Sequence, residues 1–401
     1  MKAYLDNAAT TKPFESVVDI INKTYGEDYG NPSSMHMKGY DAEKYIKSAR
    51  DIISKILKVE SKEIYFTSGG TESNNTALIG CALANNRRGK HIISTRIEHA
   101  SVYNPLLFLQ EMGYEIDFLN VDSMGHISIE ELKNTIRDDT IIVSIMHVNN
   151  EVGSVQNLEE IGRTIKSINK DILFHVDAIQ SFGKFRILPR KWNIDLLSVS
   201  GHKIHGPKGS GFLYVKDKTK IKPIILGGGQ EKGLRSGTEN VASIAGLGQA
   251  AKEIYSHIDE NVNKMYELKK HLIIELLKID GVTINAVKID YLENNEIDID
   301  KLDVNIRKTA PHVVSASFAG VRSEVLLHAL EEKDVYVSSG SACSSNHPAI
   351  SGTLQAIGVD RSLLDSTIRF SFSTFTTMEE IDYAVQMIKS LIVMLRKYTR
   401  H

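Results

Sequence analysis

The sequence is poor in cysteine and has no long apolar run. Only Cys81 and Cys343 occur among 401 residues, which argues against a disulfide framework and fits a reducing compartment, the cytoplasm. No Cys-x-x-Cys pair or His/Cys cluster has the spacing of a zinc site, so we expect no metal centre. No run reaches the roughly 18 apolar residues of a membrane span, and residues 1–6 lack the apolar core of a signal peptide.

An excess of charge of one sign is also missing. The 48 basic and 50 acidic residues give a net charge of -2 and are mixed along the chain. Without a basic stripe, a nucleic acid is a poor candidate for a tight direct ligand. Hydrophobic residues make up 42%, enough for a full core without disulfides or metals. The length predicts two or three domains, or one large catalytic domain with a smaller one.

The stretch 194–215 contains the most informative lysine. An apolar run over 194–199 ends in the string Ser-Gly-His-Lys at 200–203, and a second apolar run follows at 211–215. This pattern predicts a strand, a tight turn and a strand, with Lys203 in the turn. A lysine beside a buried strand has low-dielectric surroundings, in which its amine can act as a nucleophile or base. Taken alone, a turn lysine is more often simply solvated.

An acidic residue upstream changes that interpretation. The apolar run 172–176 ends in Asp177, and Gln180 follows three residues later. Pyridoxal phosphate needs a carboxylate for its pyridinium nitrogen and a lysine for its Schiff base. A carboxylate and a lysine at the ends of two buried strands fit this requirement.

Together, the strings His-Val-Asp-Ala-Ile-Gln at 175–180 and Ser-Gly-His-Lys at 200–203 resemble the class V, fold-type I pyridoxal-phosphate enzymes. Among these they are similar to cysteine desulfurases of the NifS/IscS type, with matching segments from 4–11 to 369–371. The resemblance implies an α/β fold with pyridoxal phosphate as cofactor. It implies a large domain over 14–261 with a mostly parallel, doubly covered sheet, and a smaller α+β domain of 1–13 and 262–401. Alternating strand and helix patterns agree with the parallel sheet.

The resemblance also assigns site residues, most of which follow predicted strands. Thr71 lies in a glycine turn that opens a helix, a suitable place for a phosphate, and Gly70 stands where the family usually has alanine. His99 would stack on the pyridine ring and take part in proton transfer. The implied cofactor-binding set is Gly70, Thr71, His99, Asn150, Asp177, Gln180, Ser200, His202, Lys203 and Thr238. The implied substrate-binding set is Asn31, Asn150 and Arg369, and the implied catalytic set is Lys203, Cys343 and His99.

The two cysteines have different surroundings. Cys343 lies in the string Ser-Ser-Gly-Ser-Ala-Cys-Ser-Ser-Asn at 338–346, which has little to pack and is expected to be a mobile loop. This string resembles the long-loop desulfurase subgroup, which implies that Cys343 carries a persulfide. Cys81 follows Leu78 and Ile79 on a predicted helix, and we interpret it as a core residue.

Two further segments bear on partners. A glycine-rich stretch at 226–240 lacks the Gly-Lys-Ser/Thr ending of a phosphate-binding loop and the strand and helix context of a dinucleotide site. In the resembling family it reaches the other subunit, where Thr238 contacts the partner's cofactor phosphate, which implies a homodimer with shared active sites. Residues 286–308 are polar, acidic and longer than is usual in the family. They form either a surface excursion or a partner-binding feature.

The resemblance implies a cysteine desulfurase that converts L-cysteine to L-alanine and delivers sulfur from Cys343 to an iron–sulfur scaffold or a tRNA-thiolation enzyme. One alternative is another class V activity, such as an aminotransferase or a selenocysteine lyase. A second is a non-catalytic sulfur-carrier scaffold of the same fold. An aminotransferase needs no loop cysteine, and a scaffold has no need of intact Lys203, Asp177 and Arg369.

Overall fold

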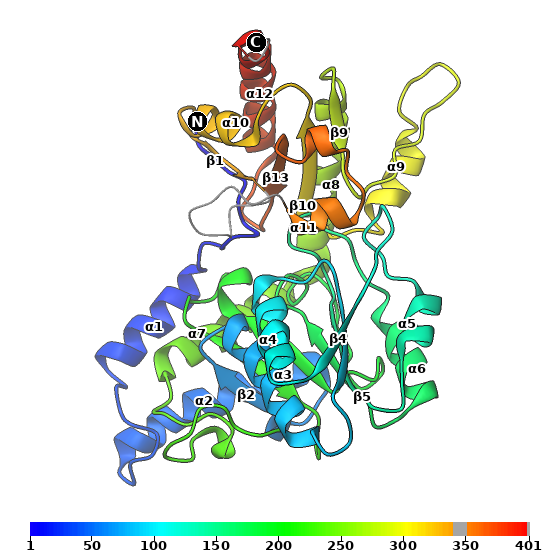
Figure 1. Ribbon diagram of the computed structural model, residues 1–401. Helices are drawn as coiled ribbons and strands as arrows, with labels where there is room; N and C mark the ends of the chain where they lie inside the picture. The colour runs from blue at the N-terminus through cyan, green and yellow to red at the C-terminus, as the bar shows by residue number, and fades with distance from the viewer. Residues whose placement is uncertain (340–350, 399–401) are drawn as a thin grey trace.

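The computed structural model describes residues 1–339 and 351–398. Two lobes lie one above the other in Figure 1, with α1 to α7 in the larger lobe and α8 to α12 in the smaller one. Within the described residues, no helix has both the length and the apolar character needed to cross a membrane.

The larger lobe is built on a seven-stranded sheet with the order β2-β8-β7-β6-β5-β3-β4. Strand β8 is antiparallel to β2 and β7, and the other neighbouring strands are parallel, which confirms the mostly parallel sheet. The strands are β2 (Ile64–Thr67), β3 (His91–Thr95), β4 (Glu115–Leu119), β5 (Thr140–Met146), β6 (Leu173–Asp177), β7 (Leu196–Ser200) and β8 (Gly211–Val215).

Helices cover both faces of this sheet. They are α1 (Glu15–Gly26), α2 (Met37–Leu57), α3 (Gly70–Asn85), α4 (Ala100–Glu111), α5 (Ile129–Thr135), α6 (Leu158–Ile168) and α7 (Val241–Ser256). Side chains alternate between the two faces because successive residues of a strand point to opposite sides. Leu196 packs with the core under α3 and α4, whereas Leu197 packs with the core under α1, α2, α6 and α7.

The smaller lobe has a four-stranded antiparallel sheet, β12-β13-β10-β9, and a parallel pair, β1 and β11. Its strands are β1 (Ala3–Tyr4), β9 (Val282–Ile284), β10 (Val313–Phe318), β11 (Val335–Tyr336), β12 (Ser338–Ser339) and β13 (Thr367–Ser371). Its helices are α8 (Ile258–Leu277), α9 (Ile299–Ile306), α10 (Ser323–Glu331), α11 (Gly352–Ala356) and α12 (Met378–Tyr398). A separate hydrophobic core joins Ala3 and Leu5 to residues from α8 to α12.

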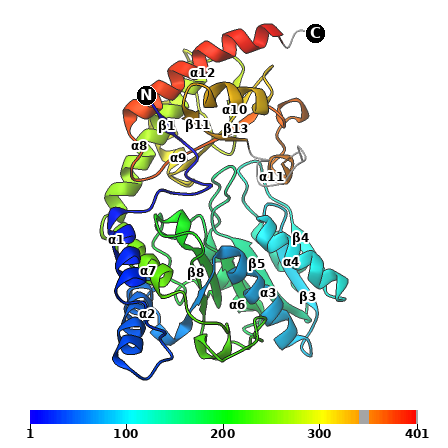
Figure 2. The same cartoon turned by 90° about the vertical axis from the view of Figure 1, so that its left-hand side faces the viewer.

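The N-terminal arm connects the lobes. It leaves β1 in the smaller lobe and runs down to α1 beside the larger lobe, as Figure 2 shows. On the way, Thr11 donates from its backbone N–H and from its hydroxyl to the carbonyl of His202, both at 2.9 Å. The arm therefore lies against the turn that carries Lys203.

The region 286–308 is more than a surface excursion. Ala286 and Val287 are buried, and α9 places Leu302 and Ile306 in the core of the smaller lobe. The hairpin around the Tyr291–Ile297 bridge extends away from the smaller lobe beyond α9 (Figure 1).

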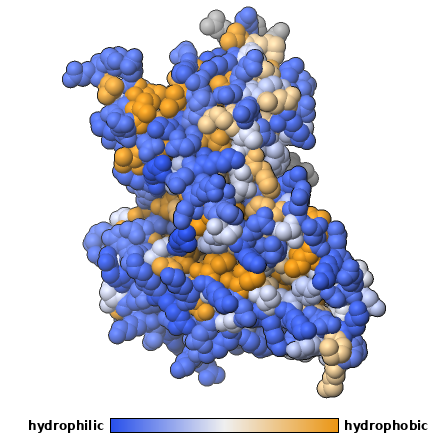
Figure 3. Space-filling model, turned by 180° about the vertical axis from the view of Figure 1, so that it is seen from behind, coloured by the Kyte–Doolittle hydropathy of each residue, from blue (hydrophilic) through white to orange (hydrophobic). Residues whose placement is uncertain are grey.

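Cys81 lies on α3 and is fully buried in the core between this helix and the large sheet, which confirms its interpretation as a core residue. The face seen in Figure 3 is largely hydrophilic, with apolar surface gathered across the middle of the molecule.

Candidate active site

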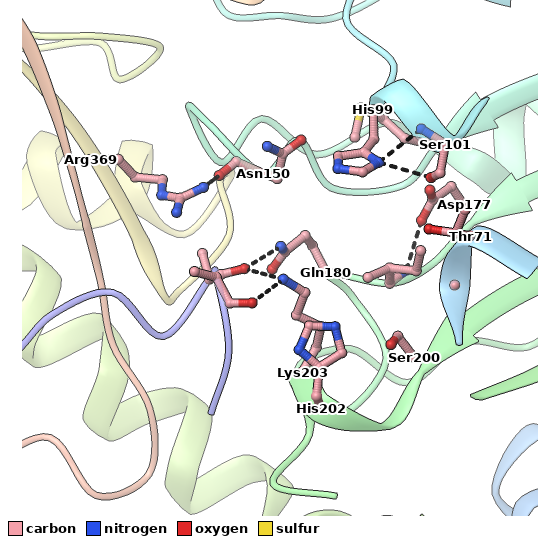
Figure 4. Close-up of a pocket in the computed structure, with 15 residues that line it drawn as sticks. Thr71, His99, Ser101, Asn150, Asp177, Gln180, Ser200, His202, Lys203 and Arg369 are labelled. Carbon is pink, nitrogen blue, oxygen red and sulfur yellow. Dashed lines mark hydrogen bonds between the residues drawn. The ribbon is translucent and has the colours of Figure 1, made fainter. Parts of the chain in front are cut away.

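A cavity of about 280 Å³ lies where the strands of the large sheet end and the smaller lobe begins. Ten predicted site residues line it, although they come from positions 70 to 369 of the chain (Figure 4). They are Gly70, Thr71, His99, Asn150, Asp177, Gln180, Ser200, His202, Lys203 and Arg369. The structure thus gathers most of the predicted set in one place, at the sheet edge where parallel sheets bind ligands.

The start of α3 forms one end of the cavity. Gly69 precedes the helix with a φ of 152°, a backbone conformation that favours glycine. The first backbone N–H groups of a helix have no intrahelical acceptor and carry the positive end of the helix dipole. With the hydroxyls of Thr71 and Ser200 in the same cavity lining, this end suits a phosphate.

Asp177, the last residue of β6, is the buried carboxylate of the cavity. It is 4% exposed and accepts hydrogen bonds from Asn74 Nδ2 at 2.8 Å and from the Ile179 backbone N–H at 2.9 Å. Burial raises the pKa of Asp177, while these two hydrogen bonds and the nearby bases His99 and Lys203 oppose the rise. A cationic group in the cavity would therefore stabilise the charged carboxylate.

His99 is held in a network that reaches Asp177. Its Nδ1 accepts the backbone N–H of Ser101 at 3.1 Å and lies 2.8 Å from the Ser101 hydroxyl, which accepts from Asn74. Burial lowers the pKa of His99, Lys203 lowers it further, and only Asp177 raises it. The ring is therefore neutral at physiological pH, with its proton on Nε2 because Nδ1 is an acceptor.

Lys203 lies in a short 3-10 turn between β7 and β8, as the sequence predicts. Its Nζ donates to the carbonyls of Ala8 and Ala9, at 2.5 and 2.6 Å. Gln180 also donates to the Ala8 carbonyl, at 3.0 Å. The N-terminal arm thus supplies the carbonyl groups that hold this amine (Figure 4).

Arg369 on β13 brings the smaller lobe to the cavity. Its Nη1 donates to the Asn150 carbonyl at 2.9 Å, and its Nη2 forms an ion pair with Asp6 at 2.9 Å. The residue is 4% exposed, and its buried Nε has no hydrogen-bond partner in the part of the chain that the structure describes. A guanidinium in this position can bind a carboxylate that enters the cavity.

The polar groups that line the cavity fit pyridoxal phosphate. The helix N-terminus and hydroxyls suit its phosphate, the buried Asp177 suits its ring nitrogen, and the Lys203 amine suits its aldehyde. The wall is closely packed at one point: a Cβ added to Gly70 would lie 2.1 Å from Cδ1 of Ile179. Glycine at position 70 therefore leaves room for the Ile179 side chain.

Two predicted residues are not brought to this cavity, and a third lies outside the described residues. Asn31 lies in the exposed loop between α1 and α2, where its Oδ1 accepts the Ser33 backbone N–H. Thr238 is exposed and lines a different depression with Ser68 and Gly237. Cys343 lies outside the described residues. Their roles remain predictions.

Several residues at the site were not predicted from the sequence. Asn74 joins Asp177 to Ser101, and Asp6 holds Arg369. Asn74 lies three residues after Thr71, a spacing that places both on one side of a helix, and this spacing could have indicated it. Nothing in the sequence pairs Asp6 with Arg369 because the two residues are 363 positions apart.

Comparisons with known proteins point to one family. The family model described as aminotransferase class-V matches residues 3–384. The chain is 40% identical over 396 residues to the cysteine desulfurase IscS of Dictyoglomus turgidum, covering 98% of this chain and 95% of that one. A solved NifS-like protein superposes with a TM-score of 0.89 at 36% identity, covering 98% of this chain and 100% of that one. The structure of SspA in complex with cysteine has a TM-score of 0.77 at 33% identity, covering 94% and 100%.

Proposed function

This chain belongs to the class-V aminotransferase family, to the cysteine desulfurases among its members, and we propose that it converts L-cysteine to L-alanine and carries the released sulfur on Cys343. The observation that carries the proposal is the single cavity lined by Lys203, Asp177 and Arg369. These residues match the amine, the ring nitrogen partner and the carboxylate partner that the reaction needs.

Nine residues of this chain, with Thr238 of a second subunit, would hold pyridoxal phosphate. The start of α3, with Thr71 and Ser200, would bind the phosphate, and Asp177 would keep the ring nitrogen protonated. His99 would lie on the ring face. When bound, the cofactor supplies an aldehyde carbon for the Lys203 amine and a ring that withdraws electrons from the substrate's Cα. The proposed cofactor-binding residues are Gly70, Thr71, His99, Asn150, Asp177, Gln180, Ser200, His202 and Lys203, with Thr238 from a second subunit.

Lys203 has two successive tasks. Its amine would hold the cofactor through the aldehyde carbon, and in the presence of substrate Nζ would accept the proton of the substrate Cα. Arg369 binds the substrate carboxylate and so fixes the direction of that Cα–H bond. Asn150, whose carbonyl accepts from Arg369 at 2.9 Å, stabilises this arrangement from the opposite lobe.

The sulfur step belongs to Cys343. Its thiolate would attack the substrate sulfur, so that an S–S bond forms as the carbon–sulfur bond breaks. The bonding electrons remain on the substrate carbon. Protonation of that carbon then gives alanine. A free thiol is mostly protonated at neutral pH, so the step needs a base or hydrogen-bond donors near the attacking sulfur. Support comes from the serine-rich string at 338–346 and from the burial of the other cysteine, Cys81.

The surface favours a homodimer. Large apolar side chains are exposed on α1, on α2 and in the loop between them, a grouping that is unusual on a monomer surface. This region lies beside the Thr238 segment, since the Tyr25 hydroxyl is 3.5 Å from Asn240 Oδ1. A second copy that covers this region would also meet Thr238. The exposed residues are Val18, Tyr25, Tyr29, Met35, Met37 and Tyr40.

The persulfide on Cys343 would be passed to a protein acceptor, either an iron–sulfur scaffold or a tRNA-thiolation enzyme. The purified protein, supplied with pyridoxal phosphate and L-cysteine, is expected to release alanine and sulfide in equal amounts when a thiol reductant is present. Lys203→Ala should lower the rate by about 10³-fold or more, whereas the exposed Lys191→Gln should leave it unchanged. Alanine release by Lys203→Ala at the wild-type rate, or turnover of selenocysteine but not cysteine, contradicts the proposal.

A further inference from the structure

A buried histidine of the smaller lobe contacts one of the residues that line the cavity. His312 directly precedes β10 and is 1% exposed. Its Nε2 lies 3.1 Å from Oε1 of Gln180, which follows β6 in the larger lobe and lines the cavity. The proposed mechanism gives His312 no task, although it touches a residue that would hold the cofactor.

The contacts of Gln180 determine which end of its amide faces His312. The other end of the amide lies 3.0 Å from the carbonyl oxygen of Ala8. Because a carbonyl oxygen can only accept, the amide atom beside Ala8 is the Nε2 donor, and Oε1 faces His312. An amide oxygen also can only accept, so the hydrogen between the two side chains belongs to Nε2 of His312. The histidine is therefore the donor and Gln180 the acceptor.

The ring of His312 is neutral, with its single proton on Nε2. Burial lowers the pKa of His312 well below its ordinary value, and neighbouring cationic side chains lower it further. Its buried Nδ1 has no hydrogen-bond partner among the residues that the structure describes. A proton on Nδ1 would therefore leave a buried N–H group without an acceptor and Oε1 of Gln180 without a donor.

The main chain around His312 is itself held in place. The fully buried Lys269 on α8 donates from Nζ to the carbonyls of Ala310 and Val313, at 2.9 and 2.8 Å. The carbonyl of His312 accepts the backbone N–H of Phe372, which follows β13, at 2.9 Å. These bonds fix the segment on both sides of the histidine, so its ring is supported at the position from which it donates to Gln180.

We propose, on the basis of the function above, that His312 is a positioning residue for Gln180: its Nε2–H group holds the amide oxygen, so that the amide nitrogen is presented to an acceptor oxygen of the cofactor. The amide nitrogen carries two hydrogens, and one of them is donated to Ala8. The second has no acceptor in the described part of the chain and remains for a bound oxygen. Without His312, the buried Oε1 would lose its donor and only the Ala8 contact would hold the amide.

The test measures the affinity of the cofactor-free protein for pyridoxal phosphate by absorbance titration. His312→Gln keeps an N–H donor close to the position of the histidine Nε2, whereas His312→Met has a similar length and no donor. Both changes are made in the wild type and in a Gln180→Met background. His328→Met, at an exposed histidine, is the matched control.

His312→Met should weaken cofactor binding by about fivefold, because one hydrogen bond to the amide is lost, and His312→Gln should stay within about twofold of the wild type. In the Gln180→Met background, His312→Met should have no further effect, because the amide that it positions is absent. His328→Met should leave the affinity unchanged. Equal weakening by His312→Met in both backgrounds would show that the histidine acts only through packing and would overturn the proposal.

A second readout needs neither the cofactor nor a variant. Nitrogen NMR of the cofactor-free wild type with labelled histidine should show His312 as the neutral Nε2–H tautomer at neutral pH. A proton on Nδ1, or a charged ring, overturns the proposal even if the variants fail to fold.

The two proposals fail in different ways. A chain that shows the expected pattern of cofactor affinities but makes no alanine would contradict the proposed function while supporting the role of His312. A chain that makes alanine but shows the same loss of affinity with and without Gln180 would do the opposite. A wild type that binds no pyridoxal phosphate would contradict both.

Discussion

Glu98 is a carboxyl near the cavity whose charged form is disfavoured. Its Oε1 accepts from the Met146 backbone N–H at 2.9 Å and from the Thr95 hydroxyl at 2.8 Å, but its buried Oε2 has no hydrogen-bond partner among the described residues. Burial first, and then the charge of Asp177, raise the pKa of Glu98 to about 8 against the opposing effect of these two hydrogen bonds. The folded protein therefore keeps this carboxyl protonated at neutral pH.

This raised pKa predicts a pH-dependent loss of stability. Between the ordinary value of 4.5 and about 8, the unfolded chain releases the Glu98 proton and the folded chain retains it, so the contribution of this group to stability falls as pH rises. Glu98→Gln should match the wild-type melting temperature at pH 5 and exceed it by about 2 °C or more at pH 8. Exposed Glu111→Gln should show no such trend, and an equal Glu98→Gln effect at both pH values contradicts the assignment.

Among single residues, the sequence could predict those that end apolar runs. Asp177 and Lys203 follow buried strands directly, so strand prediction places them at the sheet edge. It could not predict the burial of Lys184, because the turn around this residue has neither a strand nor a helix pattern. Nor could it predict that the carbonyls of Ala8 and Ala9 hold Lys203, because main-chain groups leave no mark in the sequence.

Among the elements, the N-terminus of α3 is closely packed against the segment after β6. Gly70 faces Cδ1 and Cγ1 of Ile179, which would lie 2.1 and 2.8 Å from an added Cβ. Both Gly70 and Ile179 line the cavity. A side chain at position 70 would therefore push Ile179 toward the cofactor site.

Gly70→Ala is expected to weaken binding of pyridoxal phosphate to the cofactor-free protein by about tenfold, because overpacking of this kind costs about 1–3 kcal/mol. Adding Ile179→Ala should restore the affinity, measured by absorbance titration. Gly26→Ala is the control, since nothing lies within 4 Å of its added Cβ. A Gly70→Ala protein with wild-type affinity would show that Ile179 yields without entering the site.

The elements themselves were predictable where their patterns were strong. The short apolar runs at 172–176, 194–199 and 211–215 predicted β6, β7 and β8 within about two residues, since both faces of these strands are covered and their side chains are mostly apolar. Helix α7 was not predicted, although it is buried over most of its length, because a helix that is apolar on nearly all sides lacks the usual amphipathic spacing. Helix α9 was not predicted because it lies in an acidic stretch, in which Leu302 and Ile306 are the two residues that reach the core.

At the scale of the whole molecule, the proposed homodimer requires two chains for each complete active site. Lys203 and Asp177 line one cavity, whereas Thr238 lies in another depression of the same chain. A heterodimer of Thr238→Ala and Lys203→Ala would then hold one site with both changes and one with neither. After subunit exchange of equal amounts, about a quarter of wild-type activity should appear, because half the dimers are mixed and each has one intact site.

The matched control combines Lys203→Ala with Asp177→Asn. Both residues belong to the same chain's cavity, so every site in that mixture carries a change and no activity should return. Subunit exchange is checked in both mixtures with chains that carry different tags. No recovery in the Thr238→Ala mixture, despite demonstrated exchange, would contradict a shared site.

The central claim is that Cys343 accepts sulfur from L-cysteine, and mass spectrometry of the protein after brief exposure to L-cysteine tests it most directly. We predict the added mass of one sulfur atom on the peptide that contains Cys343, and none on the peptide that contains Cys81, which is fully buried. Cys343→Ser should keep the visible absorbance of the cofactor and lose sulfide and alanine production. Sulfur on the Cys81 peptide instead, or full activity in Cys343→Ser, would contradict the account.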